Sequence, residues 1–180
     1  MSGGGTGPVP LEQLWAGWRH TYVAATTAAE RAGDGGACVF CRIAAAGGPS
    51  EDNGVVWRGE RCFAVLNAFP YASGHLLVLP ERHVADLGDL SDEESGALWS
   101  AVRSAVAAVT AGYGPDGVNV GANLGRAAGA GIPGHLHLHV VPRWSGDTNF
   151  MTSVAGVRVM PEPLPEAWRK LRAAWPGDVT

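Results

Sequence analysis

The sequence predicts an α+β fold with one mostly antiparallel sheet and helices packed against it, and three observations lead to this prediction. Short runs of aliphatic and β-branched residues are separated by segments rich in turn-forming residues, which is typical of strands. One long segment has apolar residues at helical spacing behind a helix-start signal. The chain has 180 residues, of which 46% are hydrophobic, so it can bury one core. The five predicted strands are Val55–Trp57, Cys62–Leu66, Leu76–Leu79, Val118–Ala122 and Leu136–Val141.

Three segments are predicted to be helical. Apolar residues recur at helical spacing over residues 11–22. The run Ser91-Asp92-Glu93-Glu94 has the form of a capping box, so we expect a helix from there to about Ala111. A short helix with an apolar side is expected after Pro163 and Pro165.

The organisation expected from this pattern is one domain over residues 11–180 with a C-terminal helical extension. Residues 1–10 are rich in glycine and proline, and we expect them to be a disordered tail.

Composition and charge exclude several classes of function. The formal net charge is −4, which argues against a broad basic face, so a nucleic-acid partner is not expected. No apolar run is long enough to span a membrane. The N-terminal residues lack the basic and apolar regions of a secretion signal, so we expect a cytoplasmic protein.

The most informative segment is His135-Leu136-His137-Leu138-His139. A strand has period two, so the three histidines are expected on one face, with neighbouring rings roughly 6.5–7 Å apart. One bound phosphate could therefore contact two of them. The competing interpretation is a metal site, since His-x-His on a strand is also a zinc-ligand pattern.

The loop before this segment, from Asn123 to Gly134, favours phosphate binding. Its glycines, which include Gly125, Gly129 and Gly131, allow positive φ angles and a close approach of backbone N–H groups to an anion. Taken alone, His75, which precedes a hydrophobic strand, would be interpreted as structural.

Two of the three cysteines form a Cys-x-x-Cys pair, Cys38 and Cys41. An odd cysteine count without an export signal favours metal or redox chemistry over structural disulfides. A zinc site, a redox pair and two buried thiols all remain open. Cys62 has apolar neighbours and is interpreted as a small buried hydrophobic residue.

The residues from His135 to Val141 resemble the signature of the histidine triad (HIT) superfamily, in which histidines alternate with apolar residues, at all seven positions. Four further stretches resemble the bacterial branch called diadenosine tetraphosphate phosphorylase-like: residues 14–19, the Cys-x-x-Cys pair, residues 67–75 and residues 142–151. The resemblance implies a HIT-like fold and covers roughly residues 11 to 175.

The resemblance also implies roles for the histidines. His137, the middle residue of the triad, would be the nucleophile that forms a nucleotidyl-histidine intermediate. His139 would contact the phosphate under attack, His135 is the first histidine of the catalytic triad, and His75 would support the triad.

Nucleotide-binding roles are implied in the same way. Asn67 would bind the ribose hydroxyls and Asn123 a phosphate, together with the glycines of the loop. Trp144 follows the triad strand and could line a base or distal-nucleotide pocket, or could simply be packed. Several branches carry a hydroxyl or amide side chain where this chain has Gly131 and Ile132. Backbone N–H groups, with Arg126 or Arg143, would then have to stabilise the leaving group.

Zinc-containing members resemble this chain in the pattern of cysteines and histidines. The resemblance therefore implies a structural zinc site with four protein ligands, Cys38, Cys41, His83 and His135. It also implies a two-fold homodimer.

The expected function is cleavage of dinucleoside polyphosphates at the α-phosphorus, and the residues do not decide between hydrolysis and phosphorolysis. The alternatives are hydrolysis of nucleoside phosphoramidates or adenylylated conjugates, and a non-catalytic nucleotide-binding or metal-sensing module. A role in processing DNA ends is disfavoured by the acidic charge balance.

Overall fold

The computed structural model describes residues 38–147 and 162–177 of the chain. The tail predicted for residues 1–10 and the helix predicted for residues 11–22 lie outside these described residues.

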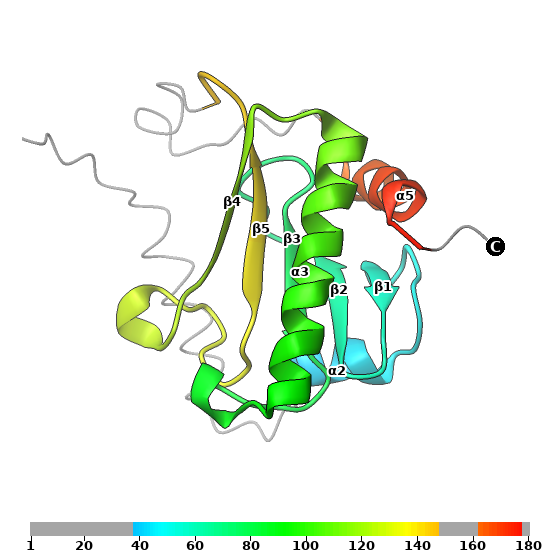
Figure 1. Cartoon of the computed structure of the whole chain (residues 1–180). Coiled ribbons are helices and arrows are strands. Elements are labelled where there is room, and N and C mark those ends of the chain that lie inside the picture. The colour runs from blue at the N-terminus through cyan, green and yellow to red at the C-terminus, as the bar shows by residue number, and fades with distance from the viewer. Residues whose placement is uncertain (1–37, 148–161, 178–180) are drawn as a thin grey trace, which may run out of the picture.

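The predicted α+β fold is confirmed, with one five-stranded sheet in the order β1-β2-β3-β5-β4 and every neighbouring pair antiparallel (Figure 1). Hydrophobic side chains fill β2 and β3 on both faces, which places these strands at the centre of the molecule. The strands are β1 (Val55–Arg58), β2 (Cys62–Leu66), β3 (Leu76–Pro80), β4 (Gly117–Ala122) and β5 (Leu138–Arg143).

The strand β5 begins two residues later than the sequence predicts. Leu138 pairs with Ala122, the last residue of β4, so the chain before Leu138 has no β4 neighbour. The N–H group of Leu136 donates instead to the carbonyl of Val84, at 2.6 Å. Residues 135–137 therefore lie directly before the strand and are held by contacts outside the sheet.

The long helix α3 (Asp92–Tyr113) begins at the predicted capping box. The Ser91 hydroxyl accepts from the Glu94 N–H group and the Glu94 carboxylate accepts from the Ser91 N–H group, so two otherwise unpaired donors are satisfied. The helix ends at Tyr113, two residues beyond the predicted end, and the next residue is Gly114, whose φ of 55° favours glycine.

Two further helices complete the described fold: α2 (Val39–Ala45) and α5 (Leu164–Ala174). The sequence does not predict the helix α2, because the Cys-x-x-Cys pair indicates only a possible metal or redox motif. Short 3₁₀ turns, η1 (Leu87–Asp89) and η2 (Arg126–Ala128), lie in the loops.

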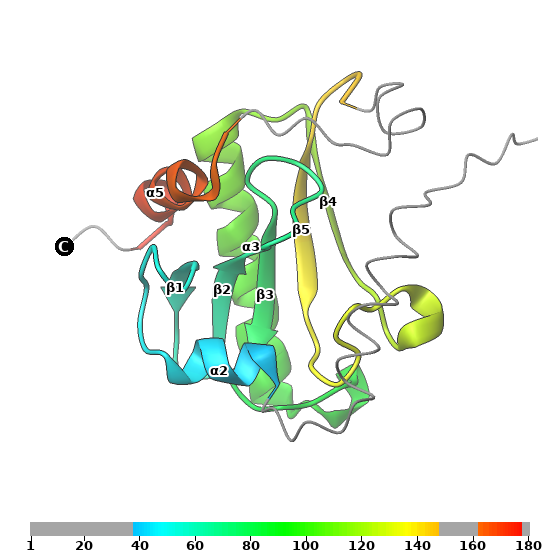
Figure 2. The same cartoon turned by 180° about the vertical axis from the view of Figure 1, so that it is seen from behind.

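The two faces of the sheet are covered differently. One face packs against α3 and α5 and forms the larger hydrophobic cluster, which includes Leu136, Leu138 and Val140 (Figure 1). The opposite face packs against α2 and forms a smaller cluster that includes Phe40, Leu77 and Leu79 (Figure 2). Side chains on β5 that do not join the larger cluster therefore point to the face of α2.

None of the helices in residues 38–147 and 162–177 is both long and apolar enough to cross a membrane.

Candidate active site and metal centre

The histidines of the triad segment lie on the α2 face of the sheet, as their alternation with leucine predicts. Leu136 and Leu138 are buried on the α3 side, so His135, His137 and His139 point the other way. The register places His139 between Leu77 on β3 and a glycine on β4.

His137 is held with one ring nitrogen free to react. Its Nδ1 lies 2.8 Å from the carbonyl oxygen of His135. A carbonyl can only accept, so Nδ1 carries the ring proton and Nε2 keeps its lone pair. Burial lowers the pKa of His137, which is 7% exposed, and this favours the neutral ring.

A chain of hydrogen bonds fixes the tautomers of His75 and His139. The Tyr71 N–H group donates to Nδ1 of His75 at 3.0 Å, so the His75 proton must be on Nε2. That nitrogen lies 2.9 Å from Nδ1 of His139 and donates to it, which leaves the His139 proton on Nε2. A backbone amide thus determines which nitrogen of His139 can donate to a ligand.

Two aromatic residues near the histidines were missed by sequence analysis. Phe40 of α2 lies 5.3 Å from the His137 ring and 5.6 Å from the His135 ring, between centroids. Tyr71 is stacked on His139 at 5.7 Å and 16°. The available signals were an apolar residue inside the Cys-x-x-Cys pair and an aromatic residue four positions before His75.

The asparagines proposed as ligands lie on loops that lead to the histidines. The side-chain amide of Asn67 is 3.3 Å from Nδ1 of His75. Asn123 directly follows β4 and opens the glycine loop. Within that loop Gly125 and Gly129 have φ angles of 75° and 89°, which side chains rarely adopt. Gly131 lies further along the same loop, four residues before His135.

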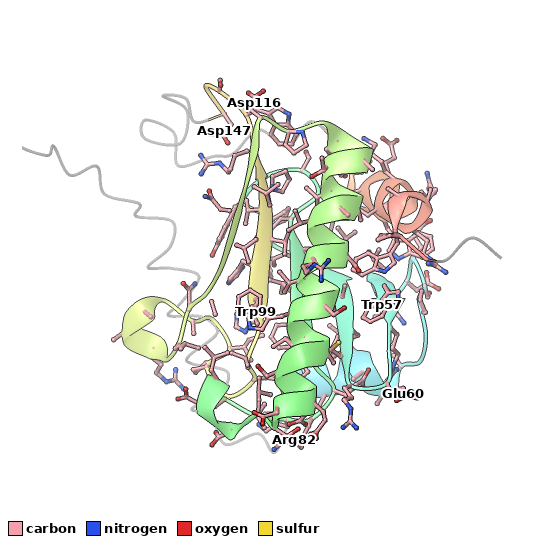
Figure 3. The ribbon with its side chains drawn as sticks, in the orientation of Figure 1. Trp57, Glu60, Arg82, Trp99, Asp116 and Asp147 are labelled. Carbon is pink, nitrogen blue, oxygen red and sulfur yellow. The ribbon has the colours of Figure 1, made fainter. Side chains whose placement is uncertain are left out.

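Arg143 and Trp144 are not brought together with the histidines. Arg143 ends β5 and pairs with Asp147 and Asn119. Trp144 makes an edge contact with the Tyr113 ring at 6.4 Å. Figure 3 shows Asp147 at one end of the sheet and Arg82, which precedes the metal-site candidate His83, at the other.

Four predicted metal ligands form a cluster, although they come from three separate parts of the chain. Cys38 precedes α2, Cys41 lies in its first turn, His83 follows β3, and His135 precedes β5. Their ligand atoms all lie within 4.8 Å of one another.

The distances in this cluster fit a tetrahedral ion. Zn–S bonds of about 2.3 Å and Zn–N bonds of about 2.0 Å at tetrahedral angles place sulfur and nitrogen about 3.5 Å apart. The Sγ atoms of Cys38 and Cys41 lie 3.5 and 3.6 Å from Nδ1 of His135, and Cys41 Sγ lies 3.4 Å from Nδ1 of His83.

The donor atoms are also oriented for a metal. Nε2 of His135 donates to the carbonyl of Pro80 at 3.0 Å, so Nδ1 keeps the lone pair that a metal needs. Burial lowers the pKa of His135, and burial followed by the charge of Cys38 raises the pKa of the Cys41 thiol. A cation between the two sulfurs would remove that repulsion. These four residues can hold a metal ion.

His135 joins the two sites. Its ring belongs to the metal cluster, while its backbone carbonyl holds the ring of His137. The metal cluster and the reactive nitrogen are therefore connected through a single residue.

The chain is similar to known proteins in both sequence and fold. A family model described as HIT domain matches residues 49–146. A protein named AP-4-A phosphorylase from Mycobacterium tuberculosis is 40% identical over 166 residues, which cover 92% of this chain and 85% of that protein.

Two solved structures have the same architecture. One is a Zn-bound histidine triad family protein from Mycobacterium smegmatis, with a TM-score of 0.62 and 34% identity, covering 77% of this chain and 92% of that one. The other is a member of the HIT family from Bacillus subtilis, with a TM-score of 0.56 and 31% identity, covering 62% and 76%.

Proposed function

Because this chain belongs to the HIT domain family, we propose that it cleaves dinucleoside polyphosphates, such as diadenosine tetraphosphate, at the α-phosphorus through a covalent bond to His137. The observation that carries the proposal is the hydrogen bond from Nδ1 of His137 to the carbonyl of His135, which leaves the Nε2 lone pair for attack. The name of the mycobacterial relative supports the substrate class.

The first chemical step forms one bond and breaks one. The lone pair on Nε2 of His137 attacks the α-phosphorus, and the phosphorus–oxygen bond to the leaving group breaks with its electron pair on oxygen. The nucleotide is then bonded to an imidazolium ring. Nε2–H of His139 and the N–H groups of the glycine loop would stabilise charge on the non-bridging oxygens.

The second step restores the histidine. Water or inorganic phosphate attacks the phosphorus, the phosphorus–nitrogen bond breaks, and its electron pair returns to Nε2 of His137, while the proton of the attacking oxygen passes to solvent. Water releases a nucleoside monophosphate and phosphate releases a nucleoside diphosphate. Phosphorolysis is supported by the name of the relative.

The nucleotide would be held near the histidines by two asparagines and three loop glycines: Asn67, Asn123, Gly125, Gly129 and Gly131. A long substrate could also reach Arg143 and Trp144, because Arg143 lies four residues further along β5 than His139, a rise of about 13 Å. We propose these two residues for the distal nucleotide only.

A polyphosphate leaving group is favoured over an amine by the loop before the triad. Ile132 packs against the cluster that contains Phe40 and offers no hydroxyl or amide to a departing group. A polyphosphate can leave as an anion, whereas an amine requires a proton. Hydrolysis of nucleoside phosphoramidates is therefore the weaker alternative.

We also propose zinc as the ion at the cluster of Cys38, Cys41, His83 and His135, on the distances above and on the Zn-bound relative. Since all four ligands come from the protein, the ion would stabilise the fold and take no direct part in the reaction.

Homodimer formation is proposed on the exposed edge of the sheet. Among residues 38–147 and 162–177, β4 is an edge strand, so its outer backbone groups can pair with a second copy. Val120 on β4 is 42% exposed and Trp99 on α3 is 50% exposed. Figure 3 shows Trp99 on the side of α3 that faces β4 and β5, so both side chains could be buried between two copies.

The function is tested by turnover of diadenosine tetraphosphate with and without inorganic phosphate. We expect His137→Asn to lower kcat by at least about 10⁴-fold while nucleotide affinity changes little, because the variant removes the nucleophile and retains the pocket. The variant Arg169→Met, which changes an exposed ion pair with Glu51, should keep normal activity. An active His137→Asn enzyme would refute the assignment.

A further inference from the structure

The two cysteines of the metal cluster lie at the start of a short helix, α2, that must be held in place by contacts with other elements. This helix has only seven residues, and such a short helix is not stable by itself. The carbonyl groups at the other end of this helix also need donors. The donor comes from a different element, β1.

Arg58, the last residue of β1, reaches the end of α2 with one arm of its guanidinium group. Its Nη1 donates to the carbonyl oxygens of Ala44 and Gly47, and the second distance is 2.8 Å. Ala44 lies in the last turn of α2 and Gly47 follows the helix. Arg58 therefore holds the C-terminal end of α2, and Cys41 lies in the first turn of the same helix.

The other arm of Arg58 reaches the segment after β3 that leads to His83. Nη2 donates to Oε2 of Glu81 at 2.7 Å. Glu81 lies between Pro80, whose carbonyl orients the His135 ring, and His83, a predicted metal ligand. One guanidinium group thus joins α2 to the segment that contains both the Pro80 carbonyl and His83.

The surroundings make this ion pair different from those on the surface. The side chains of Arg58 and Glu81 are only 29% and 21% exposed, against 60% and 40% for Arg169 and Glu51. The second carboxylate oxygen of Glu81, Oε1, is buried and has no hydrogen-bond partner in the described part of the chain. Loss of Arg58 would leave this carboxylate without its counter-charge.

We propose that Arg58, together with Glu81, is a positioning pair that holds the two halves of the metal centre in register and sets how tightly the ion is retained. The inference rests on the proposed metal site. Neither residue supplies a ligand atom of the cluster. A lysine cannot replace Arg58, because its single ammonium group lacks the planar fork that meets two carbonyls and a carboxylate at once.

The test measures metal release and does not use enzyme activity. Each variant is loaded with Zn²⁺, its metal content is determined, and the rate of Zn²⁺ transfer to an excess of a chromogenic chelator is recorded. Partners that orient metal ligands from outside typically change affinity about 10- to 100-fold when replaced. Among the residues that the structure describes, Arg58 contacts no ligand directly, so we expect Arg58→Met and Arg58→Lys to release Zn²⁺ faster by about tenfold, the lower end of this range.

The matched control is Arg169→Met, which removes the more exposed pair with Glu51 and should release Zn²⁺ at the wild-type rate. The isosteric variant Glu81→Gln keeps the test available if Arg58→Met does not fold, and it should also release Zn²⁺ faster. In the double variant Arg58→Met/Glu81→Gln the combined effect should be smaller than the sum of the two single effects, because both changes remove the same Arg58–Glu81 ion pair.

Wild-type release rates in folded Arg58→Lys and Glu81→Gln variants would overturn the inference. A wild-type chain that takes up no Zn²⁺ would overturn both the metal site and the inference. If instead Zn²⁺ release depends on Arg58 but diadenosine tetraphosphate is not cleaved, the inference holds and the proposed function fails.

Discussion

Replacing His75 by asparagine or by glutamine separates its two hydrogen bonds. His75 is fully buried, accepts from the Tyr71 N–H group through Nδ1, and donates to His139 through Nε2. An asparagine oxygen can take the place of Nδ1 but does not reach His139. A glutamine amide can take the place of Nε2 and still donate to His139.

The size of the effect follows from what His139 loses. Without the donor from position 75, the ring proton of His139 is no longer held on Nε2. In the molecules where it moves to Nδ1, the donor to the phosphate oxygens is lost. Removal of one such donor typically costs about 10²–10³-fold in kcat, which corresponds to about 2.7–4 kcal/mol. Because only part of the molecules lose the donor, this is an upper limit, and we expect His75→Asn to lower kcat by up to about 10²-fold and His75→Gln to lower it clearly less.

The assay is steady-state cleavage of diadenosine tetraphosphate, with ¹⁵N NMR of the His139 ring as an independent report of its tautomer. The loss should fall on kcat rather than KM, because the interaction strengthens in the transition state. Tyr71→Phe is the control, since it keeps the backbone donor. Equal losses in the two His75 variants, or a more active His75→Asn, would show that the donor at position 75 does not set the tautomer of His139.

Three further predictions concern pH, the metal and the dimer. Burial lowers the pKa values of His135 and His137, so both rings are neutral in the folded chain at neutral pH. The free energy of unfolding should therefore fall as pH drops below about 6.5 and through the folded pKa values, which pH-dependent unfolding measures. The kinetic constant kcat/KM should also fall on the acid side. An acid limb of kcat/KM above pH of about 6.5 would contradict this sign. Cys41→Ser should abolish stoichiometric zinc in metal analysis and lower activity, because His135 links the cluster to His137; full activity without metal would show that the link has no effect. Trp99→Glu should shift the chain from dimer to monomer in sedimentation velocity, and an unchanged dimer would place the interface elsewhere.

The sheet could be predicted from sequence because its signals are local. Each predicted strand is present, and the capping box marks the start of α3. The displaced start of β5 could not be predicted, since it depends on where β4 ends and on the contact between Leu136 and Val84, residues far apart in the chain. The short helix α2 was missed because two cysteines dominate its pattern.

The sequence predicts which histidines of the candidate site share a face, but it does not predict the hydrogen bonds that orient them. The alternation of His135, His137 and His139 predicts that they share a face, and the resemblance implies the metal ligands. The tautomers could not be predicted, because they depend on the Tyr71 amide and on a carbonyl of the chain itself. The role proposed for Arg58 was also invisible, since its partners are 11 to 23 residues away.

The central claim is that Nε2 of His137 forms a covalent bond to the α-phosphorus of the substrate. The most direct measurement is the mass of the intact chain after rapid mixing with diadenosine tetraphosphate and an alkaline quench, followed by fragmentation to locate the modified residue. One nucleotidyl group is expected at position 137 of the wild-type chain and none in His137→Asn. Steady cleavage of the substrate with no adduct, or with the group on another residue, would contradict the central claim.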